Sequence, residues 1–282
     1  MADKSYRPFI APALFEQCED EPEPCVDEYT LSTYLRSQNR LEETMEEHYN
    51  TFITEKDFAE IAGAGLNWIR LPIPYWMMGV ENEDEEPFYA NGSFKYFQKA
   101  VTWARKYGLR INLDLHTVPG SQNGWNHSSK KGDIRWMNSP NGVVDAQRTL
   151  NHIRTLTELI STDAFKDVIQ MFTVVNEPFA PTIGKDVVAS FYYEAYKMIR
   201  EITGLGEGKG PWIVFHDGFM GGDAWSDFLR GADRISLDTH PYIAFGSQNQ
   251  DPMDEQIWKP CSWAETTNTT LKKLVWYTFR KN

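Results

Sequence analysis

Two kinds of apolar spacing alternate along the chain. Short apolar runs rich in β-branched residues, typical of buried strands, lie at 66–72, 109–115, 167–175, 211–215 and 234–240. Segments with apolar residues three or four positions apart, typical of amphipathic helices, lie near 54–65, 94–104, 143–160, 185–202 and 222–230. Strands that alternate with helices predict a parallel sheet with helices packed outside it.

The clearest helix start is at Thr54. Its side chain can cap the first turn, and Asp57, at the third helical position, can return a bond to the Thr54 backbone. The glycines of the AGAG run at 62–65 then end this helix.

Five strands alternating with helices fit either a doubly wound sheet or a closed (β/α)8 barrel of the TIM type. A Gly-rich phosphate loop is missing after the first strand, which argues against a dinucleotide-binding fold. Polar residues gather at the carboxyl ends of the strands, where barrel enzymes place their chemistry: Arg70, Asp114, His116, Asn176, Glu177, His216, Asp217, Asp238, His240 and Tyr242. We expect an α/β fold of TIM-barrel type as a single domain over 1–282, left incomplete because five strands cannot close the barrel.

The composition narrows the range of partners. The 40 acidic and 28 basic residues give a net charge of -12, which repels a phosphate backbone and argues against nucleic acid as a partner. Aromatic residues make up 14% of the chain. Such side chains suit sites that stack on sugar rings, although a Trp-rich core would explain them equally well.

The sequence gives opposing indications of location. A signal peptide and a membrane-spanning window are both missing, so the chain as written is predicted to be cytoplasmic with no membrane partner. Yet glycosylation sequons at Asn91, Asn126 and Asn268 are typical of secreted proteins. The cysteines are Cys18, Cys25 and Cys261, an odd number that leaves one thiol unpaired, and we expect Cys261 to lack a partner.

Glu177 is the strongest candidate for a catalytic residue. In TVVNEPFAP, an apolar strand is followed by Asn176 and Glu177 and is then stopped by Pro178. A buried glutamate is costly unless it is paired or used, so an ion pair or a helix cap is the alternative reading. A retaining glycoside hydrolase needs two carboxyl groups about 5 Å apart, and Glu177 is suited to be one of them.

The neighbouring strand ends supply supporting groups. Arg70 can hold a nearby carboxylate ionised, while His116 and His240 each share a strand face with an aspartate two positions earlier. Buried structural histidines are the alternative. A divalent metal here would make a metal-dependent hydrolase, but the chain has no HxH pair, so we favour sugar hydrolysis without a metal or other cofactor.

Five segments, LNWIRLPIPYW, INLDLHTVPGSQNGWNHS, TVVNEPFAP, IVFHDGF and DTHPYIAF, resemble in order and spacing the fungal exo-1,3-β-glucanases of glycoside hydrolase family 5. The resemblance runs from Phe9 to Leu274. It implies an extracellular or cell-wall retaining enzyme that releases glucose from β-1,3-glucan, with no obligate protein partner. It assigns Glu177 as acid/base and Asn176 to the sugar 2-hydroxyl. It places Arg70, His116, His240 and Tyr242 around the nucleophile, and Trp125 and Phe245 as an aromatic clamp.

The resemblance also implies that the nucleophile is absent. In the family it follows the CSW motif on strand seven, whereas here Cys261-Ser262-Trp263 leads into VWYTFRKN, with Lys281 in the nucleophile's place and Glu265 too early to replace it. Arg7 replaces a substrate-binding glutamate. Strands two to six are thus expected, with strands one, seven and eight missing or replaced; the β-prone LVWYTF is the candidate to fill strand seven. A β-glucan-binding protein without turnover is therefore an alternative function.

Overall fold

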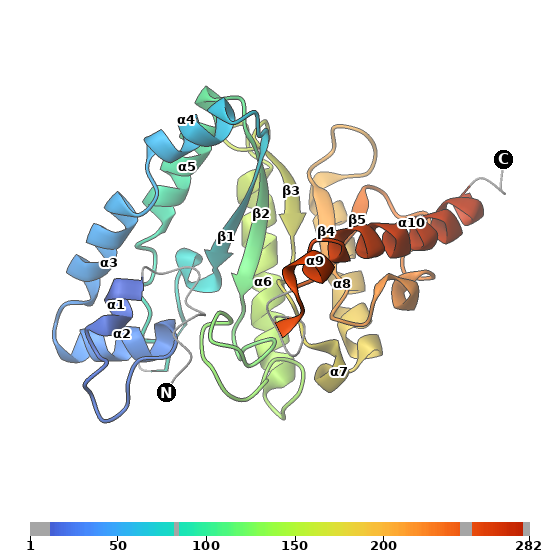
Figure 1. Cartoon of the computed structure of the whole chain (residues 1–282). Helices are drawn as coiled ribbons and strands as arrows, with labels where there is room; N and C mark the ends of the chain where they lie inside the picture. The colour runs from blue at the N-terminus through green and yellow to red at the C-terminus, as the bar shows by residue number, and fades with distance from the viewer. Residues whose placement is uncertain (1–11, 82–84, 243–249, 279–282) are drawn as a thin grey trace.

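The computed structural model describes residues 12–81, 85–242 and 250–278 (Figure 1). Its strands form one parallel sheet in the order β1-β2-β3-β4-β5. The strands are β1 (Trp68–Pro74), β2 (Arg110–Thr117), β3 (Ile169–Thr173), β4 (Trp212–His216) and β5 (Ile235–Asp238). All five predicted strands are confirmed, and the fold is α/β with the strand order of an open, partial TIM barrel.

Helices connect successive strands and pack against the sheet. The connecting helices are α5 (Phe94–Lys106), α6 (Gly142–Ile160), α7 (Ala180–Ile183) and α8 (Lys185–Thr203), with α4 (Glu55–Gly63) leading into β1. Two 3-10 turns, η1 (Tyr75–Met78) and η2 (Gly222–Trp225), follow β1 and β4. The turn η2 is shorter than the helix predicted near 222–230. In Figure 1, α6 and α8 lie behind the sheet and α4 and α5 lie beyond β1.

Local sequence explains where these elements begin. The Thr54 backbone N–H donates to the Asp57 carboxylate over 2.7 Å at the start of α4, as the capping pattern predicts. The inner strands β2, β3 and β4 are mostly buried, as expected for a parallel sheet covered by helices, whereas the edge strands β1 and β5 are only partly buried. The largest fully buried side chains include Trp76 and Trp136, so part of the aromatic content does serve the core.

The amino-terminal helices α1 (Pro12–Glu16), α2 (Glu28–Ser37) and α3 (Leu41–Thr51) form a smaller core of their own. It is built from Phe15, Cys18, Cys25, Leu31, Leu35, Leu41 and Met45. Cys18 and Cys25 are joined by a disulfide, and Cys261 is a free, exposed thiol. The prediction that Cys261 lacks a partner is thus confirmed.

An apolar cavity of about 560 Å³ lies alongside β1. Its lining includes Met45, Tyr49 and Phe52 of the helical side and Ile69 and Leu71 of the strand. β1 pairs with β2 on one side only, and β5 pairs only with β4, so both are edge strands of the described sheet. An edge strand presents backbone N–H and C=O groups without a ladder partner.

The prediction of a strand at 274–279 is wrong for the part that the structure describes. Two helices, α9 (Met253–Gln256) and α10 (Lys259–Thr278), follow β5, and residues 274–278 lie in α10. Pro260 sits in the first turn of α10, where proline is tolerated, and no glycine or further proline interrupts the helix up to 278. Since β-propensity depends on pairing with neighbouring strands, it does not prevail here.

Other sequence predictions fall outside the described residues: Arg7, Phe245 and Lys281. Among the described helices, none combines the length and the apolar character needed to cross a bilayer.

Candidate active site

Glu177 lies four residues beyond the end of β3, at the carboxyl end of the sheet. Its backbone is left-handed, with φ 46°, and its side chain is almost completely buried. A left-handed non-glycine residue costs about 1 kcal/mol or more and persists only where its surroundings hold it. Here the Asn123 side-chain amide donates to the Glu177 carbonyl oxygen over 3.1 Å. The loop after β2 therefore fixes the turn that presents the carboxylate.

A polar network fixes the orientation of Asn176. The Arg70 guanidinium donates to Asn176 Oδ1 over 2.6 Å, and Asn176 Nδ2 donates to His116 Nε2 over 3.3 Å. Asp114, fully buried, accepts from His116 Nδ1 at 2.7 Å and pairs with Arg70 at 3.0 Å. The amide of Asn176 thus has one consistent orientation, with its oxygen toward Arg70 and its nitrogen toward His116.

Two donors converge on one oxygen of Glu177. His240 Nδ1 and the Tyr242 hydroxyl each lie 2.6 Å from Glu177 Oε1, and His127 Nε2 lies 3.6 Å from the other oxygen, Oε2. Burial alone raises the pKa of Glu177, but the bonds from His240 and Tyr242 outweigh it and lower that pKa to about 2. Glu177 is therefore ionised at neutral pH.

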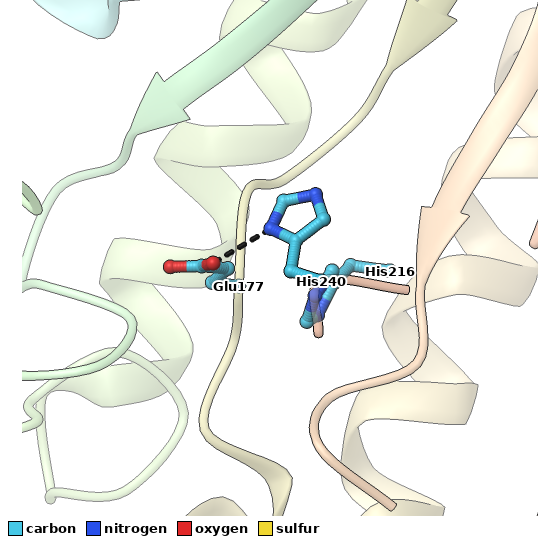
Figure 2. Close-up of side chains that lie close together, drawn as sticks. All are labelled: Glu177, His216 and His240. Carbon is cyan, nitrogen blue, oxygen red and sulfur yellow. Dashed lines mark hydrogen bonds and ion pairs between the residues drawn. The ribbon is translucent and has the colours of Figure 1, made fainter. Parts of the chain in front are cut away.

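His240 is the positive partner of this carboxylate. Its Nδ1 bonds Glu177 Oε1 (Figure 2), and its Nε2 lies 3.1 Å from Asp238 Oδ2, so the ring bridges two carboxylates. Burial lowers the pKa of His240, but the bonds to Asp238 and Glu177 outweigh this effect and raise the pKa to about 9. At neutral pH the ring is an imidazolium.

Glu177, His216 and His240 each bring one potential ligand atom to within 4.8 Å of the others, which is the spacing of a candidate metal site. Both ring nitrogens of His240 are already bonded to carboxylates. His216 Nδ1 accepts the Gly218 backbone N–H at 3.0 Å, which leaves the proton of the neutral ring on Nε2. Neither ring offers a free lone pair, so the donor chemistry does not favour a cation and does not support the metal-dependent alternative.

An aromatic platform, defined as Trp125, Phe179 and Phe219, borders the site. The Trp125 ring centroid lies 5.7 Å from that of Phe179 and 5.4 Å from that of Phe219. Trp125 also approaches His127, with ring centroids 5.6 Å apart, and His127 faces Glu177. Trp125 is 38% exposed, so its ring is accessible next to the carboxylate. Exposed aromatic faces of this kind suit stacking against sugar rings.

The structure brings together most of the residues predicted from sequence: Arg70, His116, Trp125, Asn176, Glu177, His240 and Tyr242. Arg70 lies within β1 rather than at its end, because β1 continues to Pro74. His127, Phe179 and Phe219 also border the site, although their sequence context did not single them out. His127 follows Trp125 by two residues, and Phe219 follows the end of β4. Their position on loops after strand ends is the sequence feature that could have placed them in the site.

Residues 33–275 match the family Cellulase (glycosyl hydrolase family 5). The chain belongs to glycoside hydrolase family 5. It is 38% identical over 242 residues to glucan 1,3-beta-glucosidase D of Emericella nidulans, and 37% identical over 244 residues to the probable enzyme of that name in Aspergillus niger. In both comparisons 86% of this chain is covered but only 28% of the relative, so this family 5 chain spans about a quarter of their length.

Solved structures support the fold of this family 5 chain. The rutinosidase from Aspergillus niger superposes with a TM-score of 0.70 at 20% identity, covering 84% of this chain and 66% of that one. The structure named AoRut gives the same TM-score at 19% identity, covering 83% of this chain and 64% of that one. At such identities the likeness concerns the fold alone.

Proposed function

We propose that this chain carries the acid/base half of a retaining glycoside hydrolase site that acts on the ends of β-1,3-glucan chains and releases glucose. The observation that carries the proposal is the buried Glu177, presented beside Asn176 at the carboxyl end of β3 in a family 5 chain. The relatives named glucan 1,3-beta-glucosidase support the choice of linkage.

In this proposal Glu177 protonates the leaving oxygen while a second carboxylate attacks the anomeric carbon. Asn176 binds the 2-hydroxyl of the sugar under attack, and its fixed amide orientation suits that role. The position expected for the nucleophile on sequence grounds holds Lys281, outside the described residues. Arg70, His116, His240 and Tyr242 form the polar surroundings into which a second carboxylate would fit.

The low pKa of Glu177 sets a condition on the mechanism, because a general acid must carry a proton when the bond breaks. The hydrogen bonds from His240 and Tyr242 stabilise the ionised form of Glu177, so its carboxylate carries no proton at neutral pH. A second carboxylate close to these donors would compete for them and repel the charge on Glu177, and both effects raise the Glu177 pKa. The acid function of Glu177 thus depends on the nucleophile being present.

The same observation favours a second candidate function. With Glu177 ionised and held by two donors, the site is better suited to accepting hydrogen bonds from sugar hydroxyls than to giving a proton. In that case the chain is a β-glucan-binding protein without turnover, and the aromatic platform supplies its stacking surface.

Replacing Glu177 with Gln tests the proposal. We expect the parent to turn over an aryl β-glucoside with a good leaving group only slowly, and Glu177→Gln to change that rate by less than about three-fold, because losing one member of a catalytic unit removes most of what the others contribute. Binding is measured in parallel by titration calorimetry, comparing a β-1,3-linked glucose oligosaccharide with its β-1,4-linked isomer.

The outcomes separate the two functions. Binding of the β-1,3-linked sugar without turnover selects the binding protein, whereas robust parent turnover abolished by the substitution shows that another carboxylate acts as nucleophile. A parent that binds neither sugar contradicts both functions.

The location proposed for the protein is extracellular or in the cell wall. The Cys18–Cys25 disulfide supports it, because disulfides persist mainly in oxidising compartments.

A further inference from the structure

His216 is a buried group in the site to which neither the resemblance nor the proposed mechanism assigns a role. It is the last residue of β4, its relative exposure is 0%, and in register it pairs with Asp238 of β5. One nitrogen, Nδ1, accepts the Gly218 backbone N–H, while the other, Nε2, has no hydrogen-bond partner among the described residues. A buried polar atom left without a partner costs about 1 to 3 kcal/mol, so its retention calls for a reason.

The state of the His216 ring is fixed by its surroundings. Because Nδ1 accepts a backbone N–H, the neutral ring carries its proton on Nε2. Burial, helped by the positive charge of His240, lowers the pKa of His216 to about 4, so the ring stays neutral at working pH. Nε2 is therefore a donor, and its missing partner is an acceptor such as a hydroxyl oxygen.

The position of His216 indicates which acceptor it meets. Its ring lies 4.4 Å from that of His240 and 5.0 Å from that of Phe219, measured between centroids. It thus stands between the Glu177–His240 pair and the aromatic platform, and Figure 2 shows it beside that pair. Under the proposed function, Glu177 meets the oxygen between two sugars, and the platform holds the sugar that leaves.

We propose that His216 binds the leaving-group sugar: when the side chains that cover its ring move aside, Nε2–H donates to one of the sugar's hydroxyl oxygens. This inference rests on the proposed glycosidase or glucan-binding function. It makes His216 a residue that selects a hydroxyl-bearing second sugar over an apolar group in the same place.

Two variants of His216 test the roles of its two ring nitrogens separately. In His216→Asn the amide oxygen replaces Nδ1 and keeps the Gly218 bond, but nothing reaches the Nε2 position. In His216→Gln the amide nitrogen reaches the Nε2 position and restores a donor. Both lose the ring, and they differ from each other by one methylene group. Thermal unfolding of each variant checks that the fold is retained.

Binding is measured by calorimetry with two probes that share a glucose: a disaccharide of two β-1,3-linked glucose units, and phenyl β-glucoside, which has an apolar ring in place of the second sugar. We expect His216→Asn to weaken disaccharide binding roughly ten-fold and phenyl glucoside binding less than about two-fold. His216→Gln should keep disaccharide binding within about three-fold of the parent.

Equal losses for both probes, equal losses in both variants, or no loss in His216→Asn would each overturn the assignment while leaving the proposed function intact. A parent that binds neither probe would contradict the proposed function as well. If a variant does not fold, the parent gives the answer by NMR. The Nε2–H resonance of His216 should move downfield, as a new hydrogen bond requires, on adding the disaccharide but not on adding phenyl glucoside. An unchanged resonance would overturn the proposal.

Discussion

Glu177 is buried, charged and in a left-handed backbone conformation, and each of these features opposes folding. The ion pair with His240 and the hydrogen bond from Tyr242 offset the charge, and Asn123 holds the backbone. Removing only one partner of such a pair leaves an uncompensated buried charge, which is more harmful than losing both. The carboxylate and the imidazolium therefore have to be considered together.

The pair makes stability depend on pH in two directions. The pKa of Glu177 is lowered to about 2, so its contribution is present above about 4.5 and is lost as the pH falls toward 2. The pKa of His240 is raised to about 9, so its contribution is present below about 6.5 and is lost as the pH rises toward 9. His127 and His216, with pKa values lowered to about 4, add further loss on the acid side.

The alkaline side gives the cleaner test of the His240 pKa. Between pH 6 and 9 we expect the parent to lose about 2 to 3 kcal/mol more free energy of unfolding than His240→Gln, which has no proton to lose there. The free energies are measured by urea unfolding at a series of pH values. Titrating groups distant from His240 contribute equally to both proteins and cancel in the difference, whereas Glu177, Asp238 and His216 lose the influence of its charge in the variant. Parallel pH profiles for the two proteins would show that His240 is not held protonated.

At the level of elements, the sheet could be predicted because each strand is a short β-branched run bounded by helices. The site could be predicted because the carboxyl ends of parallel strands meet at one edge, which brings Arg70, His116 and Glu177 together from separate strands. The aromatic platform could not be predicted in full. Phe179 and Phe219 lie on loops, and the spacing of apolar residues does not predict the course of a loop. Residues 274–279 were predicted to form a strand, but 274–278 lie in α10, because strand propensity depends on a neighbouring strand that the sequence does not reveal.

The aromatic platform predicts a loss of sugar affinity on truncating Trp125. Aromatic side chains that bind sugars contribute to affinity by stacking their exposed face on the sugar ring. We therefore expect Trp125→Ala to weaken binding of the β-1,3-linked oligosaccharide by roughly ten-fold or more. Trp68→Ala is the matched control, because Trp68 is also 38% exposed but begins β1, at the amino end of the sheet. Calorimetric titration of both variants makes the comparison. Equal effects of the two substitutions would remove the platform from the binding site.

The amino-terminal helices depend on their disulfide. Cys18 and Cys25 are both buried in the small core around Leu31 and Leu35, so reduction should lower the stability of this region by about 2 to 3 kcal/mol for a loop of this size. Alkylation followed by mass spectrometry should label one thiol, that of Cys261, before reduction and three afterwards. Labelling of three thiols in the untreated protein would contradict the pairing.

At the scale of the whole molecule, the sheet formed by the described residues has β1 and β5 as its edges, and an apolar cavity of about 560 Å³ lies beside β1. Unpaired edges and exposed apolar surface favour association between chains. We therefore expect much of residues 1–282 expressed alone to aggregate, and the soluble fraction, on which the binding and unfolding measurements are made, to bind a hydrophobic dye. Dye fluorescence and size-exclusion chromatography test this. A monodisperse protein with a sharp two-state melt and no dye binding would show that the edge is covered.

The order of the strands in the sheet follows their order in the chain. During synthesis from the amino end, each strand that emerges from the ribosome finds its sheet neighbour already made, and no later segment has to be inserted between earlier ones. Glu177 is synthesised sixty-three residues before His240. The carboxylate is thus positioned by β2 and β3 well before its imidazolium is made, so the nascent chain completes its polar site only when β5 has joined the sheet.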